Sequence, residues 1–234
     1  MIELERLRRE LDACWKSAKS SSGKCHHIAG YAARTGHDRH LLVTQELITD
    51  HSGNGAKLLD IYPDAIPADF AAAIVGINPY WPDRGKENLA SIRRLDDGKK
   101  FHRYKEQILS KLPSRSMIAH LELVQCGSCN GNEAWDVINV CQPKFFDKVV
   151  ALIKPKVIVT IGRLASERLF EVTIAANSGG SWEGIKRRHA TYEPAFFGDH
   201  RCAIVFVKQP SGWVSKEGRQ AAAEAIAQAY KEFS

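Results

Sequence analysis

The chain has 234 residues, of which 44% are hydrophobic and 26% charged, and its formal net charge is +6. This length predicts one large domain, and the ordinary composition predicts a globular protein with a core large enough to need no disulfides. No run of 18 apolar residues is present, which excludes a transmembrane helix. The N-terminal residues alternate in charge and lack a signal-peptide core, so we expect a cytoplasmic protein. The basic excess suits a partner that carries phosphates, although many enzymes that act on small anions share it.

The predicted elements begin with an amphipathic helix over residues 2–18, where apolar residues recur at helical spacing. Residues 26–69 are mixed in character and indicate short helices and loops. From residue 70 onward strands alternate with helices, and the polar, charged segment 82–98 indicates a surface loop. Strands are predicted over residues 70–77, 118–126, 157–161 and 203–207, and helices over 101–112, 144–153, 163–170 and 216–233.

This alternation predicts a three-layer α/β/α sandwich around a mostly parallel central sheet of four strands. We expect residues 1–234 to form a single domain, with residues 1–69 packed on it as a helical and loop extension. Ligands of such sheets bind at the carboxyl ends of the strands. Two polar turns directly follow predicted strands, and each sets a proline beside an amide or hydroxyl side chain: Asn78-Pro79-Tyr80 and Gln209-Pro210-Ser211-Gly212.

Three cysteines are spaced as metal ligands can be. Cys126 and Cys129 form a C-x-x-C pair, and Cys141 follows twelve residues later. Three thiolates could bind a metal ion or an iron–sulfur cluster. Alternatively they are reduced structural thiols, an interpretation favoured by the lack of a second C-x-x-C pair. We therefore expect no metal and no cofactor.

Four segments in this order resemble the uracil-DNA glycosylase superfamily: "VGINPYW", "LELVQC", "KPKVIVTIGRLASERLF" and "VKQPSGW". The first is similar to the water-activating motif, written Gly-Ile-Asn-Pro in the mismatch-specific branch. The last is similar to the loop that stabilises the leaving base, which is His-Pro-Ser in most branches. The third is similar to a strand of the iron–sulfur branch. The likeness covers roughly residues 70–233, and it implies a monofunctional, monomeric DNA glycosylase that flips its target base out of the helix.

The resemblance assigns a role to each residue of the first motif. Asn78 would orient the attacking water through its amide oxygen, and Gly76 and Ile77 would offer backbone amides to the base. Pro79 would fix the direction of the turn, and Tyr80 would form a wall of the pocket. Without the resemblance, Asn78 would be interpreted as an Asx-turn residue before proline and Tyr80 as a core residue.

The second motif departs from the family at its first residue. Gln209 occupies the histidine position, where its amide can still donate a hydrogen bond to the base but cannot titrate. Pro210 would stiffen the turn, while Ser211 and Gly212 would reach phosphate. Trp213 would fill the gap left by the flipped base, or would be an ordinary packing residue.

Glu122 stands about where the iron–sulfur branch has an asparagine that reads the base edge. A carboxylate only accepts hydrogen bonds unless it is protonated, so it would favour a base edge that presents donors, such as an amino group. Alternatively Glu122 is a strand residue that faces solvent. In the same branch, Cys126 and Cys141 match two cluster ligands, whereas Cys14 and Cys25 are spaced more widely than the N-terminal pair of that branch.

The leading hypothesis is a DNA glycosylase for uracil or another deaminated base, acting in base excision repair. The departures at Gln209 and Glu122 favour a second hypothesis, a nucleic-acid-binding member of the same fold with altered catalysis. A third is an α/β enzyme that acts on free nucleotides. The basic segment 184–192 would track phosphates under the first two hypotheses, or would be a solvated run of charge.

Overall fold

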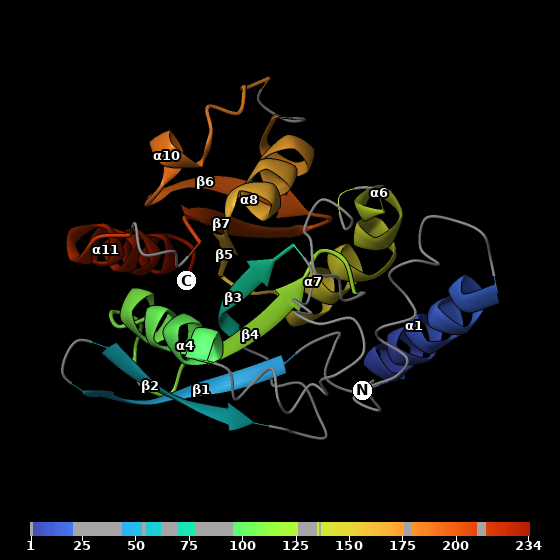
Figure 1. Ribbon diagram of the computed structural model, residues 1–234, viewed down its shortest axis with the longest axis horizontal. Coiled ribbons are helices and arrows are strands. Elements are labelled where there is room, and N and C mark those ends of the chain that lie inside the picture. The colour runs from blue at the N-terminus through green and yellow to red at the C-terminus, as the bar shows by residue number, and fades with distance from the viewer. Residues whose placement is uncertain are drawn as a thin grey trace.

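The described part of the chain is a mixed α/β structure built on a seven-stranded sheet (Figure 1). The computed structural model describes residues 2–20, 44–52, 55–61, 70–77, 96–125, 135, 137–175, 179–209 and 214–234. The strands are β1 (Thr44–Ser52), β2 (Gly55–Ile61), β3 (Phe70–Gly76), β4 (Met117–Glu122), β5 (Val157–Ile161), β6 (Thr191–Phe197) and β7 (His200–Val207). Their order across the sheet is β2-β1-β4-β3-β5-β7-β6.

The helices lie between and around these strands. They are α1 (Ile2–Ser20), α4 (Asp96–Ile108), α6 (Ile138–Cys141), α7 (Asp147–Ile153), α8 (Arg163–Leu169), α10 (Ile185–Arg188) and α11 (Lys216–Glu232), with π-helical segments η1 (Gln142–Phe146) and η2 (Phe170–Ala175). Each of the helices predicted over 2–18, 101–112, 144–153, 163–170 and 216–233 is present, with ends that differ by a few residues. None of the helices within the described ranges has the length and apolar character needed to cross a membrane.

The four central strands β4, β3, β5 and β7 run parallel to one another. These are the four strands that the sequence predicts, so the α/β class and the parallel centre are confirmed. The expectation of four strands in the sheet is wrong, because β1 pairs antiparallel with β4, β2 with β1, and β6 with β7. The centre is therefore parallel and both margins are antiparallel.

The three additional strands lack the apolar runs of the central ones. In β1 the buried residues include Gln45 and Glu46, so polar residues occupy positions where the expected signal is apolar. A hairpin signal is nevertheless present in the sequence, because Gly53-Asn54 separates β1 from β2, which begins at Gly55. In β6, Pro194 argues against a strand, but proline is tolerated at a sheet edge, where β6 lies. Residues 44–52 and 55–61 thus belong to the sheet and not to short helices and loops.

Helices cover both faces of the sheet. One core cluster includes α1, α7, α8 and one face of the central strands, with Leu7, Val149 and Leu169 among its buried residues. The other includes α4, α11 and the opposite face, with Ile108 and Ile226 among its buried residues. Because side chains alternate along a strand, β4 contributes Ala119 and Leu121 to the first cluster and Ile118 to the second.

Candidate functional site at the carboxyl ends of the central strands

The carboxyl ends of β4, β3, β5 and β7 meet at one edge of the sheet because these strands are parallel. Glu122 ends β4, Gly76 ends β3, Gly162 follows β5, and Gln209 follows β7. This edge thus brings together residues that the sequence analysis selected from three separate segments. It is also the edge at which open parallel sheets bind their ligands.

Gly76 and Glu122 are register partners across the β3–β4 pair. The pairing continues beyond both strands, because the N–H groups of Leu123 and Val124 donate to the carbonyls of Gly76 and Ile77 at 3.1 and 2.9 Å. The Glu122 carboxyl occupies the space that a side chain at residue 76 would fill. A Cβ built there would overlap Oε2 and lie 3.1 Å from Cδ. Glycine at this position therefore provides the space for the carboxyl at the end of β3.

The Glu122 carboxyl is buried without a hydrogen bond to Oε2 from any described residue. The residue as a whole retains some exposure, but Oε2 is shielded from solvent. Burial raises the pKa of Glu122 to about 8, because a charged carboxylate is poorly solvated there. The alternative that Glu122 is an ordinary strand residue facing solvent is therefore wrong.

Gln125 is a residue of this edge that the sequence analysis missed. Its side chain is 1% exposed, and its Nε2 donates to the carbonyl of Glu122 at 2.8 Å. Its Oε1 is buried and has no hydrogen-bond partner among the described residues. Buried polar atoms are nearly always satisfied, so two unsatisfied oxygens within four residues mark the end of β4 as a place where a ligand or water would bind. The signal in the sequence is a second polar residue, after Glu122, in the otherwise apolar "LELVQC".

Gln209 lies at the opposite side of this edge, beside Gly162. The Gln209 Cβ and Oε1 are each 3.7 Å from the position that a Cβ at Gly162 would take, and Gly162 itself has φ +90°, which favours glycine. The Gly162 N–H donates to the Val207 carbonyl at 2.9 Å. Gln209 is exposed, so its amide is free to meet a partner from solvent.

The backbone before Gln209 is fixed from two helices. The Tyr104 hydroxyl of α4 donates to the Lys208 carbonyl at 2.8 Å, and the Lys208 N–H donates to Nδ1 of His189 at 3.2 Å. Nε2 of His189 donates to the carbonyl of Gly218 in the first turn of α11 at 3.1 Å. The sequence gives no motif that points to Tyr104, and it points to His189 only as part of the basic segment 184–192, with a role in contacting phosphates.

The remaining predicted site residues lie outside the described residues. They are Asn78, Pro79 and Tyr80 of the first motif and Pro210, Ser211, Gly212 and Trp213 of the second. Their roles remain predictions from the resemblance. The described residues that flank them, Ile77 and Gln209, begin these two segments at the same edge of the sheet.

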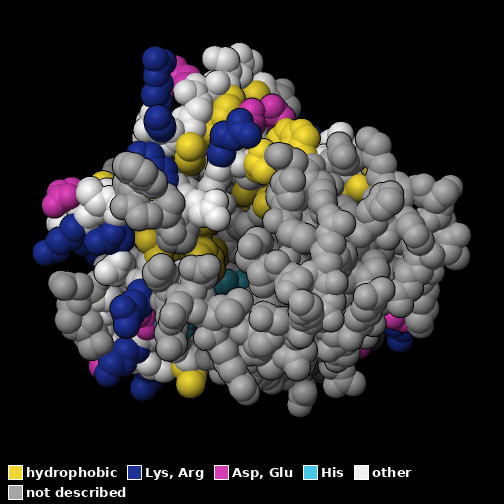
Figure 2. Space-filling view, viewed as in Figure 1, with side chains coloured by type: hydrophobic (Ala, Val, Ile, Leu, Met, Phe, Trp, Pro, Cys, Tyr) yellow, Lys and Arg dark blue, Asp and Glu magenta, His cyan; other side chains and the backbone are white. Residues whose placement is uncertain are grey.

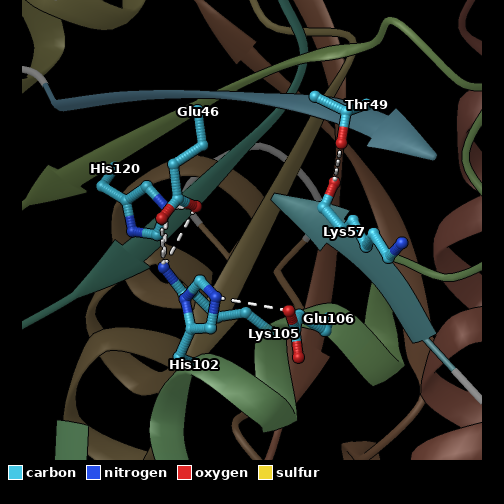
Figure 3. Close-up of polar contacts among 7 residues, drawn as sticks. All are labelled: Glu46, Thr49, Lys57, His102, Lys105, Glu106 and His120. Atoms are coloured by element: carbon cyan, nitrogen blue, oxygen red, sulfur yellow. Dashed lines mark hydrogen bonds and ion pairs between the residues drawn. The ribbon is translucent and has the colours of Figure 1, made fainter. Parts of the chain in front are cut away.

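A buried ionic cluster lies on the α4 face of β4 (Figure 3). Lys105 Nζ donates to both carboxylate oxygens of Glu46, at 2.8 and 3.0 Å, and Nε2 of His120 lies 2.7 Å from Glu46 Oε2. Burial alone would raise the pKa of Glu46, but His120 and then Lys105 outweigh it and hold that pKa well below its usual range. The cluster fastens α4 to β1 and β4 beneath the candidate site.

The six cysteines are divided between the described and the undescribed parts of the chain. Cys25, Cys126 and Cys129 lie outside the described residues, whereas Cys14 and Cys141 are half-buried and Cys202 is buried. The Sγ of Cys141 accepts a hydrogen bond from the Gln125 N–H at 3.3 Å. Within the ranges that the structure describes, no three His, Cys, Asp or Glu side chains are grouped as metal ligands.

The basic segment 184–192 divides into two parts. The Arg188 guanidinium lies 4.1 Å from the Phe170 ring centroid and pairs with Glu193 at 3.2 Å, so it serves packing. Lys186 and Arg187 on α10 are exposed. Only this second pair suits a phosphate contact. The chain matches no protein-family model and no curated protein.

Proposed function

We propose that the protein is a DNA glycosylase that hydrolyses the N-glycosidic bond of a flipped uracil or other deaminated base. The observation that carries the proposal is the placement of the Glu122 carboxyl over Gly76 at the carboxyl edge of the parallel strands, with Oε2 unsatisfied among the described residues. Gln209 reaches the same edge from β7. The described ends of two motif segments, Gly76 and Gln209, therefore lie at the same sheet edge as Glu122, the residue at the position that reads the base edge in the resemblance.

In the proposed reaction the bond between the sugar C1′ and the base nitrogen breaks, and the base leaves with the bonding electron pair. Water adds to C1′, and the proton that it loses ends on the departing base anion, directly or through solvent. Asn78 would hold the water under the sugar, and the Gln209 amide would donate to the departing base. A donor held in a water-poor site contributes about 3–4 kcal/mol to such a step. Flipping the base costs a few kcal/mol of unstacking.

A basic groove supports a nucleic-acid partner. The groove has a volume of about 590 Å³ and lies between α4, α11 and the β1–β2 hairpin, where His51, Lys111, Lys216 and Arg219 line it. Figure 2 shows Lys and Arg side chains gathered on this side of the molecule. The remaining lining residues are neutral. Such a surface suits a phosphate backbone.

The proposal is tested by single-turnover cleavage of oligonucleotides that carry uracil, hypoxanthine, xanthine or mismatched thymine. We expect product from at least one substrate, with losses on the order of 10²-fold in Gln209→Ala and a large loss in Asn78→Ala. Gln228→Ala, at an exposed position toward the end of α11, is the matched control. Tight binding without product on any substrate would support the nucleic-acid-binding alternative instead. Absence of both binding and product would favour free nucleotides as the ligands.

A further inference from the structure

The unsatisfied oxygens at the end of β4 raise the question of what Glu122 presents to a ligand. Oε2 of Glu122 and Oε1 of Gln125 are both buried and have no hydrogen-bond partner among the described residues. The carboxyl points over Gly76, the last residue of β3, directly before the segment that contains Asn78. A group in this position can contact a ligand at the strand ends, and its protonation state decides which ligands it accepts.

Among the described residues, the elements that neighbour Glu122 provide no cation for its carboxyl. On β3, Gly76 and Ile77 carry no charge. On the same face of β4, His120 contacts Glu46 of β1, and Lys105 of α4 donates to both oxygens of Glu46. The Tyr104 hydroxyl of α4 is bonded to the Lys208 carbonyl. Burial alone accounts for the raised pKa of Glu122, about 8, so the carboxyl retains its proton at neutral pH.

We propose that Glu122 is a neutral specificity residue whose O–H donates to a carbonyl oxygen of the base and whose C=O accepts from the adjacent N–H. This inference rests on the proposed function and names its substrate class, a base with a lactam edge such as uracil or hypoxanthine. It reverses the sequence-based expectation that an acidic residue here would select an edge of donors.

The chemical distinction follows from counting donors and acceptors. A carboxylate only accepts, so it suits an edge with two adjacent donors, as guanine has. A neutral carboxyl offers one donor and one acceptor side by side, which matches the C=O and N–H of a lactam and mismatches two donors. Guanine shares the lactam C=O and N–H at O6 and N1, and the amino and ring-nitrogen edges of adenine and cytosine also pair one donor with one acceptor. The neutral state therefore lets Glu122 accept a lactam edge that the carboxylate would repel, while exclusion of the normal bases falls to other contacts.

The first test compares wild type with Glu122→Gln, which keeps one donor and one acceptor but cannot ionise. Single-turnover cleavage of uracil and hypoxanthine oligonucleotides is measured from about pH 6 to about pH 9. We expect the wild-type rate to fall above about pH 8, approaching tenfold per pH unit, while the variant rate stays level. Identical pH profiles in the two proteins would overturn the inference.

The second test observes the proton directly and needs no activity. Infrared difference spectra of protein labelled with ¹³C at the glutamate carboxyls, wild type minus Glu122→Gln, distinguish a neutral acid from a carboxylate. A neutral-acid band at pH 7 that disappears as the pH rises supports the inference. A carboxylate band at pH 7 together with cleavage overturns this inference alone. A neutral-acid band without binding or cleavage of any oligonucleotide overturns both the base assignment and the proposed function.

Discussion

His189 and Lys208 are joined by a hydrogen bond in which the Lys208 N–H donates to the imidazole Nδ1 at 3.2 Å. Because the opposite ring nitrogen faces the Gly218 carbonyl, the ring is required to be neutral, with its proton on Nε2. Burial, reinforced by the charge of Lys208, lowers the pKa of His189. This one ring links α11 to the backbone that carries Gln209.

The neutral state of His189 predicts a pH dependence of folding. In the unfolded chain the imidazole takes up a proton at its ordinary pKa, about 6.5, whereas the folded protein resists protonation. Stability from this group is therefore present above that pH and is lost as the pH falls through it. Urea unfolding at several pH values should show this loss in wild type relative to His189→Gln. An exposed histidine, His51, is the control in His51→Gln. An unchanged difference between wild type and His189→Gln from about pH 5 to about pH 8 would contradict the assignment.

The buried cluster predicts a large cost for removing its carboxylate. Glu46 is 5% exposed and Lys105 6%, so Glu46→Gln leaves a buried ammonium without its counter-charge. We expect a loss of about 3–5 kcal/mol in the free energy of unfolding, measured by urea denaturation at neutral pH. Asp50→Asn breaks an exposed pair with Lys57, whose N–O distance is 3.9 Å, and should cost less than about 1 kcal/mol.

The same cluster also predicts acid sensitivity. Because the pKa of Glu46 is lowered in the folded state, its stabilising contribution is present above the ordinary pKa of glutamate and is lost as the pH falls below it. Wild type should therefore lose more stability on acidification than Glu46→Gln does. Parallel losses in the two proteins would show that the cluster does not titrate as inferred.

The Gly76–Glu122 contact predicts a coupled pair of substitutions. A methyl group at residue 76 would overlap the Glu122 carboxyl, so Gly76→Ala should cost about 1–3 kcal/mol through overpacking. Glu122→Ala removes the obstacle, and in that background the same change should cost little. A double-mutant cycle by urea denaturation measures the coupling. Additive effects would mean that the carboxyl does not occupy this space.

The central strands could be predicted because they are almost entirely apolar. Val157 to Ile161 are all buried, and a strand covered on both faces needs no alternating pattern. The strands at the margins of the sheet could not be predicted from their sequences. In β1 the buried residue Glu46 forms an ion pair with α4, and β6 carries Pro194, which is tolerated because β6 lies at an edge. Both exceptions depend on tertiary neighbours that local sequence does not reveal.

The candidate site likewise contains some residues that the sequence predicts and others that only the fold reveals. Residues in motifs, such as Gly76 and Gln209, could be selected from sequence, and the parallel order of β3, β4, β5 and β7 brings them to one edge. The raised pKa of Glu122 could not be predicted, because burial causes it. Gln125 and Tyr104 were missed because their contribution lies in single contacts with the Glu122 and Lys208 carbonyls.

The basic groove predicts how nucleic-acid binding depends on salt. Lys111 faces it from the turn that follows α4, and Lys216 from the first turn of α11. If each neutralises one phosphate, the double variant Lys111→Gln/Lys216→Gln should reduce the slope of log affinity against log salt by up to ~1.8, since each contact contributes ~0.9 on duplex DNA. The control is Lys231→Gln, at an exposed position at the far end of α11, which should leave the slope unchanged. Fluorescence anisotropy across a salt series gives both slopes, and equal slopes for the double variant and wild type would exclude the groove from the DNA interface.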